Sequence, residues 1–124
     1  MSSESIKPPA YKTIFSQTST PNGMQYEDSV LFDMGDEAAQ VTFTLLCQNI
    51  PQGTTIGFSC GSPGPNPPIY LPPTKVETYP VFTTGIVSDV PANFEAMITY
   101  WANFEQQPPA NASLTLQAMI IVNQ

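Results

Sequence analysis

Apolar and polar residues alternate along much of the chain, with the period of two that is typical of half-buried β-strands. The alternation is clearest over residues 94–104 and 113–123, where every second residue is apolar. A helix over 94–104 is the alternative, but the aromatic and β-branched residues there favour a strand. The pattern predicts strands over 11–15, 29–34, 40–47, 54–60, 76–82, 85–90, 94–104 and 113–123.

Turn-forming residues separate the predicted strands. Residues 49–53, with the sequence Asn-Ile-Pro-Gln-Gly, indicate a turn that joins 40–47 to 54–60 in a β-hairpin. Residues 16–23 are predicted to form a loop, because Ser, Thr, Pro, Asn and Gly are concentrated there.

Prolines interrupt the middle of the chain. The chain contains 14 of them, and several lie within residues 61–73. Because proline donates no backbone hydrogen bond, we expect a stiff extended loop over 61–73 rather than a regular strand. Pro80 interrupts the strand over 76–82 for the same reason, which predicts that this strand lies at the edge of a sheet.

Seven or eight short strands at this spacing predict an all-β fold, an antiparallel β-sandwich or jelly-roll-like domain. The 124 residues are sufficient for one domain with one core. We expect an N-terminal extended arm over residues 1–10, followed by a single β-sandwich domain over 11–124. The shared faces of the strands predict a core of Phe43, Leu45, Ile56, Phe58, Ile98, Leu116, Ile120 and Val122.

The net charge of −7 excludes several functions. The chain has 3 basic residues, all of them Lys, against 10 acidic ones. Nucleic acids are bound through Lys and Arg, so we expect no nucleic-acid partner, and anionic membrane surfaces are disfavoured for the same reason. No run of about 18 apolar residues is present, so we expect no membrane insertion.

The beginning of the sequence, residues 1–5, lacks the basic and apolar regions of a signal peptide. We therefore expect synthesis in the cytosol, with release as part of a virion or other particle as one outcome. A mature secreted form that was given a start Met is the alternative.

The absence of histidine limits the chemistry that the chain can perform. Serine–histidine–aspartate triads, cysteine–histidine pairs and zinc sites with histidine ligands are all excluded. Catalysis would have to rely on carboxylates, and the sequence singles out no pair of them. We therefore predict a protein that is not an enzyme and has no cofactor.

Asp33, Asp36 and Glu37 form an acidic segment, with Glu27 and Asp28 nearby. Oxygen ligands on a loop suit a calcium ion, although the spacing differs from that of the helix-loop-helix calcium loop. A solvated acidic turn between two strands is the simpler interpretation, so no metal site is predicted and the calcium question stays open.

Cys47 and Cys60 are predicted to be free thiols. In the predicted hairpin, Cys47 would lie opposite Thr55 and Cys60 opposite Thr42. An offset of five residues at about 3.3 Å each exceeds the roughly 7 Å that a disulfide allows between Cα atoms. Both thiols are then expected to fill the core as small apolar groups.

Four aromatic residues, Tyr70, Tyr79, Tyr100 and Trp101, are candidates for a sugar-binding face or a subunit interface. Aromatic rings stack on the apolar faces of sugars, while the polar edge of Tyr or Trp stays hydrated. Because neighbouring residues of a strand point to opposite faces, either Tyr100 or Trp101 must point away from the core.

Two classes of function fit these observations. The first is a structural or interaction module that acts in many copies, such as a virion decoration, a tail or fibre component, or a filament subunit. A surface of Thr, Ser, Asn, Gln and Pro has few flexible charged side chains, which are costly to immobilise in an interface. The alternative is a carbohydrate-binding lectin or adhesin domain with a glycan partner.

The N-terminal arm is the candidate subunit contact. Pro8 and Pro9 favour an extended backbone without donors, so the arm would bind mainly through side chains. Ile6 and the adjoining Tyr11 supply the apolar surface. We expect a homo-oligomer or larger protein assembly in which Ile6, Pro8, Pro9 and Tyr11 contact a neighbouring copy.

Overall fold

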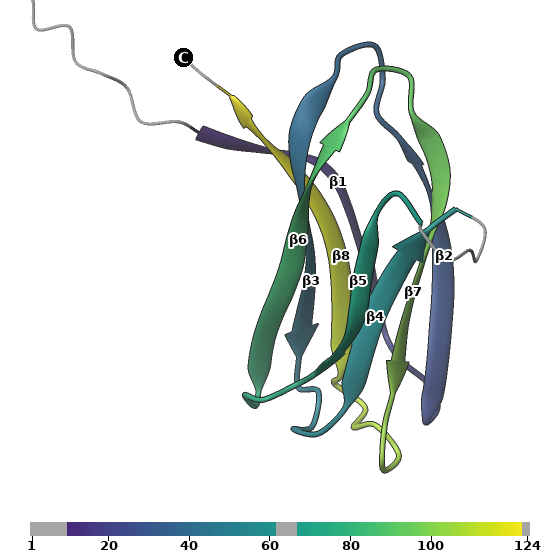
Figure 1. The fold of residues 1–124 in the computed structure, drawn as a ribbon. Helices are drawn as coiled ribbons and strands as arrows, with labels where there is room; N and C mark the ends of the chain where they lie inside the picture. Colours follow the sequence, from purple (N-terminus) through teal and green to yellow (C-terminus); the bar gives the residue numbers. More distant parts are fainter. Residues whose placement is uncertain (1–9, 62–66, 123–124) are drawn as a thin grey trace, which may run out of the picture.

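The computed structural model describes residues 10–61 and 67–122 and confirms the all-β fold. Eight antiparallel strands form two sheets of four strands (Figure 1). Within these residues, no helix is long and apolar enough to cross a membrane. The strands are β1 (Ala10–Ser19), β2 (Gln25–Asp33), β3 (Ala39–Gln48), β4 (Thr55–Cys60), β5 (Tyr70–Lys75), β6 (Val81–Val90), β7 (Glu95–Asn103) and β8 (Ser113–Val122).

The strand order is that of a jelly roll. The first sheet, here called sheet A, has the order β1-β8-β3-β6, and the second, sheet B, has the order β2-β7-β4-β5. Successive strands cross from one sheet to the other, except β4 and β5, which are neighbours in sheet B. Two four-stranded sheets connected in this way make the eight-stranded jelly roll.

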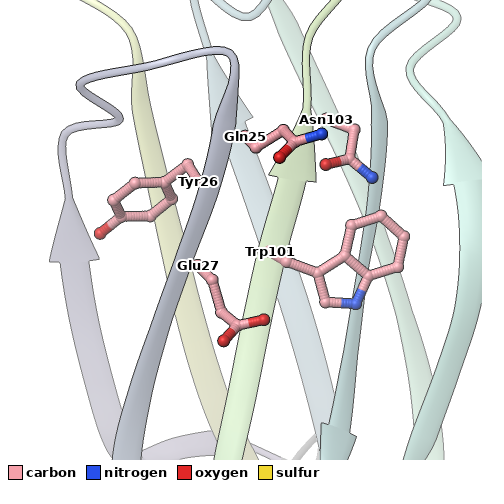
Figure 2. Close-up of a pocket in the computed structure, with 5 residues that line it drawn as sticks. All are labelled: Gln25, Tyr26, Glu27, Trp101 and Asn103. Atoms are coloured by element: carbon pink, nitrogen blue, oxygen red, sulfur yellow. The ribbon is translucent and has the colours of Figure 1, made fainter.

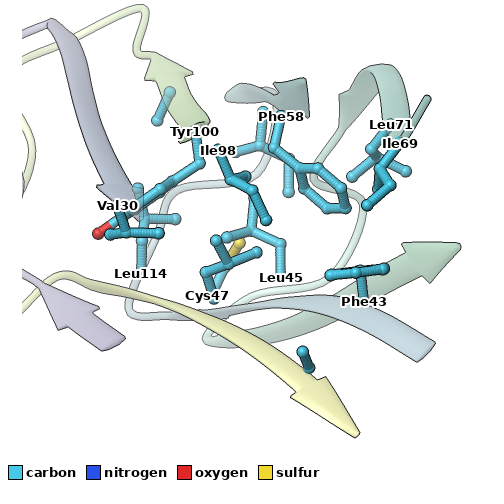
Figure 3. Packing of buried hydrophobic residues seen from close by; sticks show 14 of the residues in the cluster. Val30, Phe43, Leu45, Cys47, Phe58, Ile69, Leu71, Ile98, Tyr100 and Leu114 are labelled. Carbon is cyan, nitrogen blue, oxygen red and sulfur yellow. The ribbon is translucent and has the colours of Figure 1, made fainter. Parts of the chain in front are cut away.

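Phe43 is completely buried in the core between the sheets. Its ring packs edge-on against Phe32 of sheet B, with 5.3 Å between the ring centroids. The ring of Phe58, also from sheet B, lies 6.4 Å from that of Phe43 between centroids. Figure 3 shows buried side chains of both sheets, among them Phe43, Leu45 and Phe58, meeting in the space between the sheets. Close packing of this kind joins the two sheets into one domain.

The predicted core is largely confirmed. Every second residue of β3, β7 and β8 faces inward, as the alternation predicts. Ile120 is partly buried against the core, and the side chain of Val122 lies outside the described residues. The other six predicted core residues, Phe43, Leu45, Ile56, Phe58, Ile98 and Leu116, are completely buried.

The predicted hairpin of 40–47 with 54–60 is wrong, because β3 belongs to sheet A and β4 to sheet B. Asn49 and Gly53, both with positive φ, lie in the connection between the sheets. An apolar face looks the same in the sequence whether the next strand lies beside it or opposite it. Cys47 and Cys60 are buried free thiols, as predicted, although the hairpin register from which this was predicted does not exist, since they lie in separate sheets.

The proline-rich segment also departs from the prediction. The expected loop over 61–73 gives way to β5 at Tyr70, and β5 contains Pro72 and Pro73. The ladder between β4 and β5 is irregular between Ile56 and Phe58, opposite the two prolines. The sheet accommodates them because β5 lies at its edge, where an irregular ladder is tolerated.

The strand predicted over 76–82 is replaced by a connection and a longer strand. Residues 76–80 link β5 to β6, and the peptide bond between Tyr79 and Pro80 is cis. The ladder begins only after Pro80, and the two short strands expected around Gly85 are one edge strand, β6.

The first strand is longer than predicted at both of its ends. Ala10, the last residue of the predicted arm, already pairs with Val122. Residues 16–19, predicted as part of a loop, continue β1 and pair with β8. Ile6, Pro8 and Pro9 of the predicted subunit contact lie outside the described residues, and Tyr11 is the member of that set that the structure places.

The position of Phe43 leads to a test of the core. Replacing Phe43 by Ala should lower the free energy of unfolding by about 3–5 kcal/mol, because it leaves a cavity between the sheets. Leu31→Ala is the matched control, since Leu31 is 64% exposed, and it should change stability by less than about 0.5 kcal/mol. Chemical denaturation measures both values, and similar losses for the two variants would contradict the described core.

The thiols provide a second test, which depends on pH. Burial raises the pKa of Cys47 to about 12 and that of Cys60 to about 11, from an ordinary value of 9.0. As the pH rises above 9.0, the unfolded chain loses thiol protons that the folded chain keeps, so the free energy of unfolding should fall between pH 9.0 and about 11–12.

The same burial should protect both thiols from alkylation at pH 8 in the folded protein. Both should react once the chain is unfolded in denaturant, and mass spectrometry counts the groups added. A chain that takes up no reagent even when unfolded would contain a Cys47–Cys60 disulfide, which contradicts the structure.

Candidate functional site

Trp101 lies on the outer face of sheet B, where the alternation of β7 directs it. It pairs with Glu27 of β2 on one side and with Gly57 of β4 on the other. In the next row of the same face, Asn103 pairs with Gln25. Directly paired residues of antiparallel strands share a face, so strand pairing brings these side chains together.

The indole ring of Trp101 packs directly on the backbone of Gly57, and we call this contact the seat of Trp101. A Cβ atom added to Gly57 would lie 2.6 Å from Cζ2 and 2.9 Å from Cε2 of Trp101. Any side chain at this position would therefore displace the ring. In Figure 2 the indole is seen broadside, turned from β7 toward β4, which is the orientation of a ring that lies along the sheet.

A hollow of about 520 Å³ opens beside the indole. Glu27 extends from β2 across β7, and the amides of Gln25 and Asn103 lie next to each other at the end of the strand (Figure 2). Tyr26 also borders the hollow, but its ring points away from Trp101. We call this place the Trp101 hollow; it combines one aromatic ring with one carboxylate and two amides.

The four aromatic residues that were predicted as one candidate surface, Tyr70, Tyr79, Tyr100 and Trp101, do not lie together in the structure. Tyr100 is completely buried, so it cannot stack on a surface ligand, and its place in the predicted binding face is corrected. Tyr70 is exposed on β5 and pairs with Ser59, on the same face as Trp101. Tyr79 is exposed on the connection before β6, near Pro51 and Gln52.

Tyr100 instead joins a polar cluster between the sheets. Its hydroxyl hydrogen-bonds with Ser19 of β1 and donates to Asp28 of β2 at 3.3 Å. Gln17 donates to the same carboxylate at 3.2 Å. Burial is the main cause that raises the pKa of Tyr100, so the phenol remains protonated. These hydrogen bonds satisfy the hydroxyl of a tyrosine that is otherwise packed in the core.

The outer face of sheet A has a different character. Among the side chains that the register directs outward from its four strands, Asp89 alone is charged. Thr, Ser and Gln dominate this face, and the hydroxyls of Thr18 and Thr115 hydrogen-bond across neighbouring strands at 2.8 Å. Val81 and Val87 add exposed apolar surface on β6. The face is broad, uncharged and partly apolar.

One end of sheet A continues as a projection. β8 pairs with β3 only as far as Ile120, but it pairs with β1 as far as Val122. We call the two-stranded segment of 10–12 with 120–122 the β1–β8 ribbon; it bends away from the sandwich (Figure 1). The register of β1 shifts between Thr13 and Phe15 at its base, and such bulges bend strands.

The β1–β8 ribbon exposes apolar side chains. Tyr11 and Ile121 pair directly and are 64% and 45% exposed. A hollow of about 460 Å³ lies at the base of the ribbon. It is bordered by apolar residues that include Ile14, Met34 and Ile120, and also by Lys12, Asp36 and Glu37. Apolar side chains on a projection, next to a partly apolar hollow, are typical of a contact surface.

The acidic segment of Asp33, Asp36 and Glu37 forms an open turn after β2. Among the residues that the structure describes, no three Asp, Glu, Cys or His side chains come together as metal ligands. Asp33 accepts a hydrogen bond from the backbone N–H of Gly35 at 2.9 Å, as in a turn stabilised by aspartate. Asp36 and Glu37 are exposed. The segment connects β2 to β3 as a turn with exposed carboxylates.

Sequence reasoning missed Gln25, Glu27 and Asn103 as partners of Trp101. Gln25 and Glu27 are distant from Trp101 in the sequence, and β2 was predicted to begin only at Ser29. The signal that could have found them is the alternation of Gln25, Glu27 and Ser29, which extends β2 toward its N-terminal end.

Comparison with known proteins identifies no family. No protein-family model matches the chain, and no curated protein matches its sequence. Among solved structures, the fold is similar to part of a chain in the structure of infectious bursal disease virus, Gx strain, with a TM-score of 0.44 and 14% sequence identity. The match covers 92% of this chain and 33% of the viral chain, so this chain spans about a third of that one.

The seat of Trp101 leads to a test with a matched glycine control. Gly57→Ala should displace the indole, lower the stability by about 1–3 kcal/mol and shift the emission of Trp101 to longer wavelengths. Trp101 is the single tryptophan, so the emission reports on this site alone. Gly23→Ala, where an added Cβ meets nothing within 4 Å, should leave the emission unchanged. An unchanged spectrum for Gly57→Ala would contradict the contact.

Proposed function

We propose that this chain is a non-enzymatic structural module that acts in many copies, as a virion decoration, a tail or fibre component, or a filament subunit. The observation that supports this most is the β1–β8 ribbon, which holds Tyr11 and Ile121 in solvent. Two strands alone gain little stability from their own packing. A neighbouring copy that covers the ribbon would bury this apolar surface and hold the projection in place.

The outer face of sheet A supports the same proposal. Threonine and serine lose little side-chain entropy when a neighbour covers them, and the face has Asp89 as its single outward charge. Contact between two such faces would therefore bury few charges and immobilise few long side chains, which are the main costs of association.

The free edge of β6 adds a second route for contact. This strand of ten residues contains no proline and one charged residue, Asp89. The other edge strands each have such a feature: β2 has three carboxylates, β5 has two prolines and a lysine, and β1 has Lys12 and a register shift between Thr13 and Phe15. An edge without such protection can pair with a strand of another chain.

The net charge of −7 opposes this association at low salt. Raising the ionic strength from about 0.01 M to about 0.15 M shortens the screening length from about 30 Å to about 8 Å. Self-association through the uncharged face should therefore strengthen with added salt, whereas contacts based on ion pairs would weaken.

A pair of lysine substitutions tests the proposal. Ile121→Lys places a charge on the β1–β8 ribbon, and Leu31→Lys places the same charge at an exposed apolar position of sheet B. The first should shift the mass distribution toward the single chain, because a desolvated lysine would lie in the contact. The second should leave it unchanged. Sedimentation velocity over a range of concentrations and at both salt levels measures the distribution.

Two outcomes would refute the proposal. One is an unmodified protein that stays monomeric at high concentration and at physiological salt. The other is equal weakening of the oligomer by both substitutions, which would indicate a general effect of charge rather than a contact at the ribbon. Circular dichroism confirms that both variants are folded before masses are compared.

A further inference from the structure

The Trp101 hollow has a composition that self-association does not explain. It lies on the outer face of sheet B, whereas the β1–β8 ribbon and the uncharged face belong to sheet A. Glu27 lies in this hollow, and a carboxylate is costly to bury without a partner. A hydrated surface site for a small polar ligand fits this arrangement better than a contact between copies.

We infer that the Trp101 hollow binds a neutral sugar ring. The seat on Gly57 leaves the opposite face of the indole for stacking with the C–H groups of a pyranose. The carboxylate of Glu27 would accept hydrogen bonds from two hydroxyls, and the amides of Gln25 and Asn103 would both donate and accept. A volume of about 520 Å³ is sufficient for one or two rings.

The charges around the hollow select against other ligands. Glu27 would repel phosphates, sulfates and acidic sugars, and the net charge of −7 acts in the same direction. Cages for organic cations use several aromatic rings around the charge. In the Trp101 hollow, the second aromatic residue, Tyr26, points away from the indole. A neutral ring with several hydroxyls can form hydrogen bonds with Glu27, Gln25 and Asn103 and stack on Trp101.

The same face offers a continuation for a longer glycan. Ser29, Thr99 and Ser59 form a row of hydroxyls beside Trp101, and Ser29 hydrogen-bonds with Thr99 at 2.9 Å. Tyr70 extends this row on β5, two strands from β7 and therefore about 10 Å away. An oligosaccharide lying across the strands would meet one aromatic ring at each end, so it should bind more tightly than a single sugar.

Fluorescence titration tests the site directly, because its ring is the only tryptophan. The probes are the methyl glycosides of glucose, galactose, mannose and N-acetylglucosamine, lactose, and chitotriose as a neutral oligosaccharide, with sialyllactose as the acidic comparison. At least one neutral probe should produce a saturable change in the emission of Trp101, and sialyllactose should bind more weakly than lactose.

Matched carboxylate variants locate the site. Glu27→Gln removes the charge while keeping the shape, and it should weaken binding by about tenfold, as expected for the loss of a charged hydrogen-bond acceptor. Glu95→Gln is the control, since Glu95 lies on the same face at the opposite end of β7. It should bind like the unmodified protein, and thermal melting shows whether both variants are folded.

Three results would overturn the inference: no saturable change with any neutral probe, tighter binding of sialyllactose than of lactose, or equal weakening by Glu27→Gln and Glu95→Gln. None of them bears on self-association. Conversely, a monomeric protein that binds a neutral sugar would refute the proposed assembly and leave this inference in place, so the two failures are distinguishable.

Discussion

The contact of Phe43 with Phe32 and Phe58 fixes how the two sheets lie over each other. These rings come from both sheets and meet in the middle of the core, so neither sheet can slide or change its register without opening a cavity. Because the side-chain period of a strand is two, this inner packing also determines every outward residue. Both candidate surfaces are therefore consequences of the core.

The two outer faces obtained in this way differ in chemistry. Sheet A presents hydroxyls, amides and apolar side chains around one carboxylate, whereas sheet B presents Trp101 together with the charged residues Glu27, Asp33, Glu95 and Lys75. The first composition suits a protein neighbour and the second a hydrated polar ligand. A division of this kind allows one small domain to assemble through one face and bind through the other without competition between the two.

Alternation in the sequence was sufficient to predict the strands whose inner faces are strongly apolar. For β3, β7 and β8 it gave the buried face correctly. It also predicted that Tyr100 and Trp101 point to opposite faces of the same strand. It could not show which strands share a sheet, because an apolar face is equally satisfied by a neighbour beside it or across the core. The predicted hairpin between β3 and β4 was wrong for this reason.

Predictions from local composition were wrong where pairing with neighbouring strands overrode the preference of a residue for a loop. Pro72 and Pro73 are tolerated in β5 because they lie at a sheet edge, opposite an irregularity of the ladder. Ser16 and Thr18 resemble loop residues, but pairing with β8 makes them part of β1. The Trp101 hollow depends on pairing between β2 and β7, which connects residues far apart in the sequence. Such long-range partners leave no local signal.

The unequal charge of the two faces has a consequence for any assembly that forms through sheet A. Every copy would then turn sheet B toward the surrounding solution, with three carboxylates, those of Glu27, Asp33 and Glu95, against the single amine of Lys75. The finished particle or fibre would have an anionic coat, although its internal contacts are almost free of charge. Like-charged coats repel one another, so the assemblies would stay dispersed instead of clumping, and the coat would attract cations from the medium.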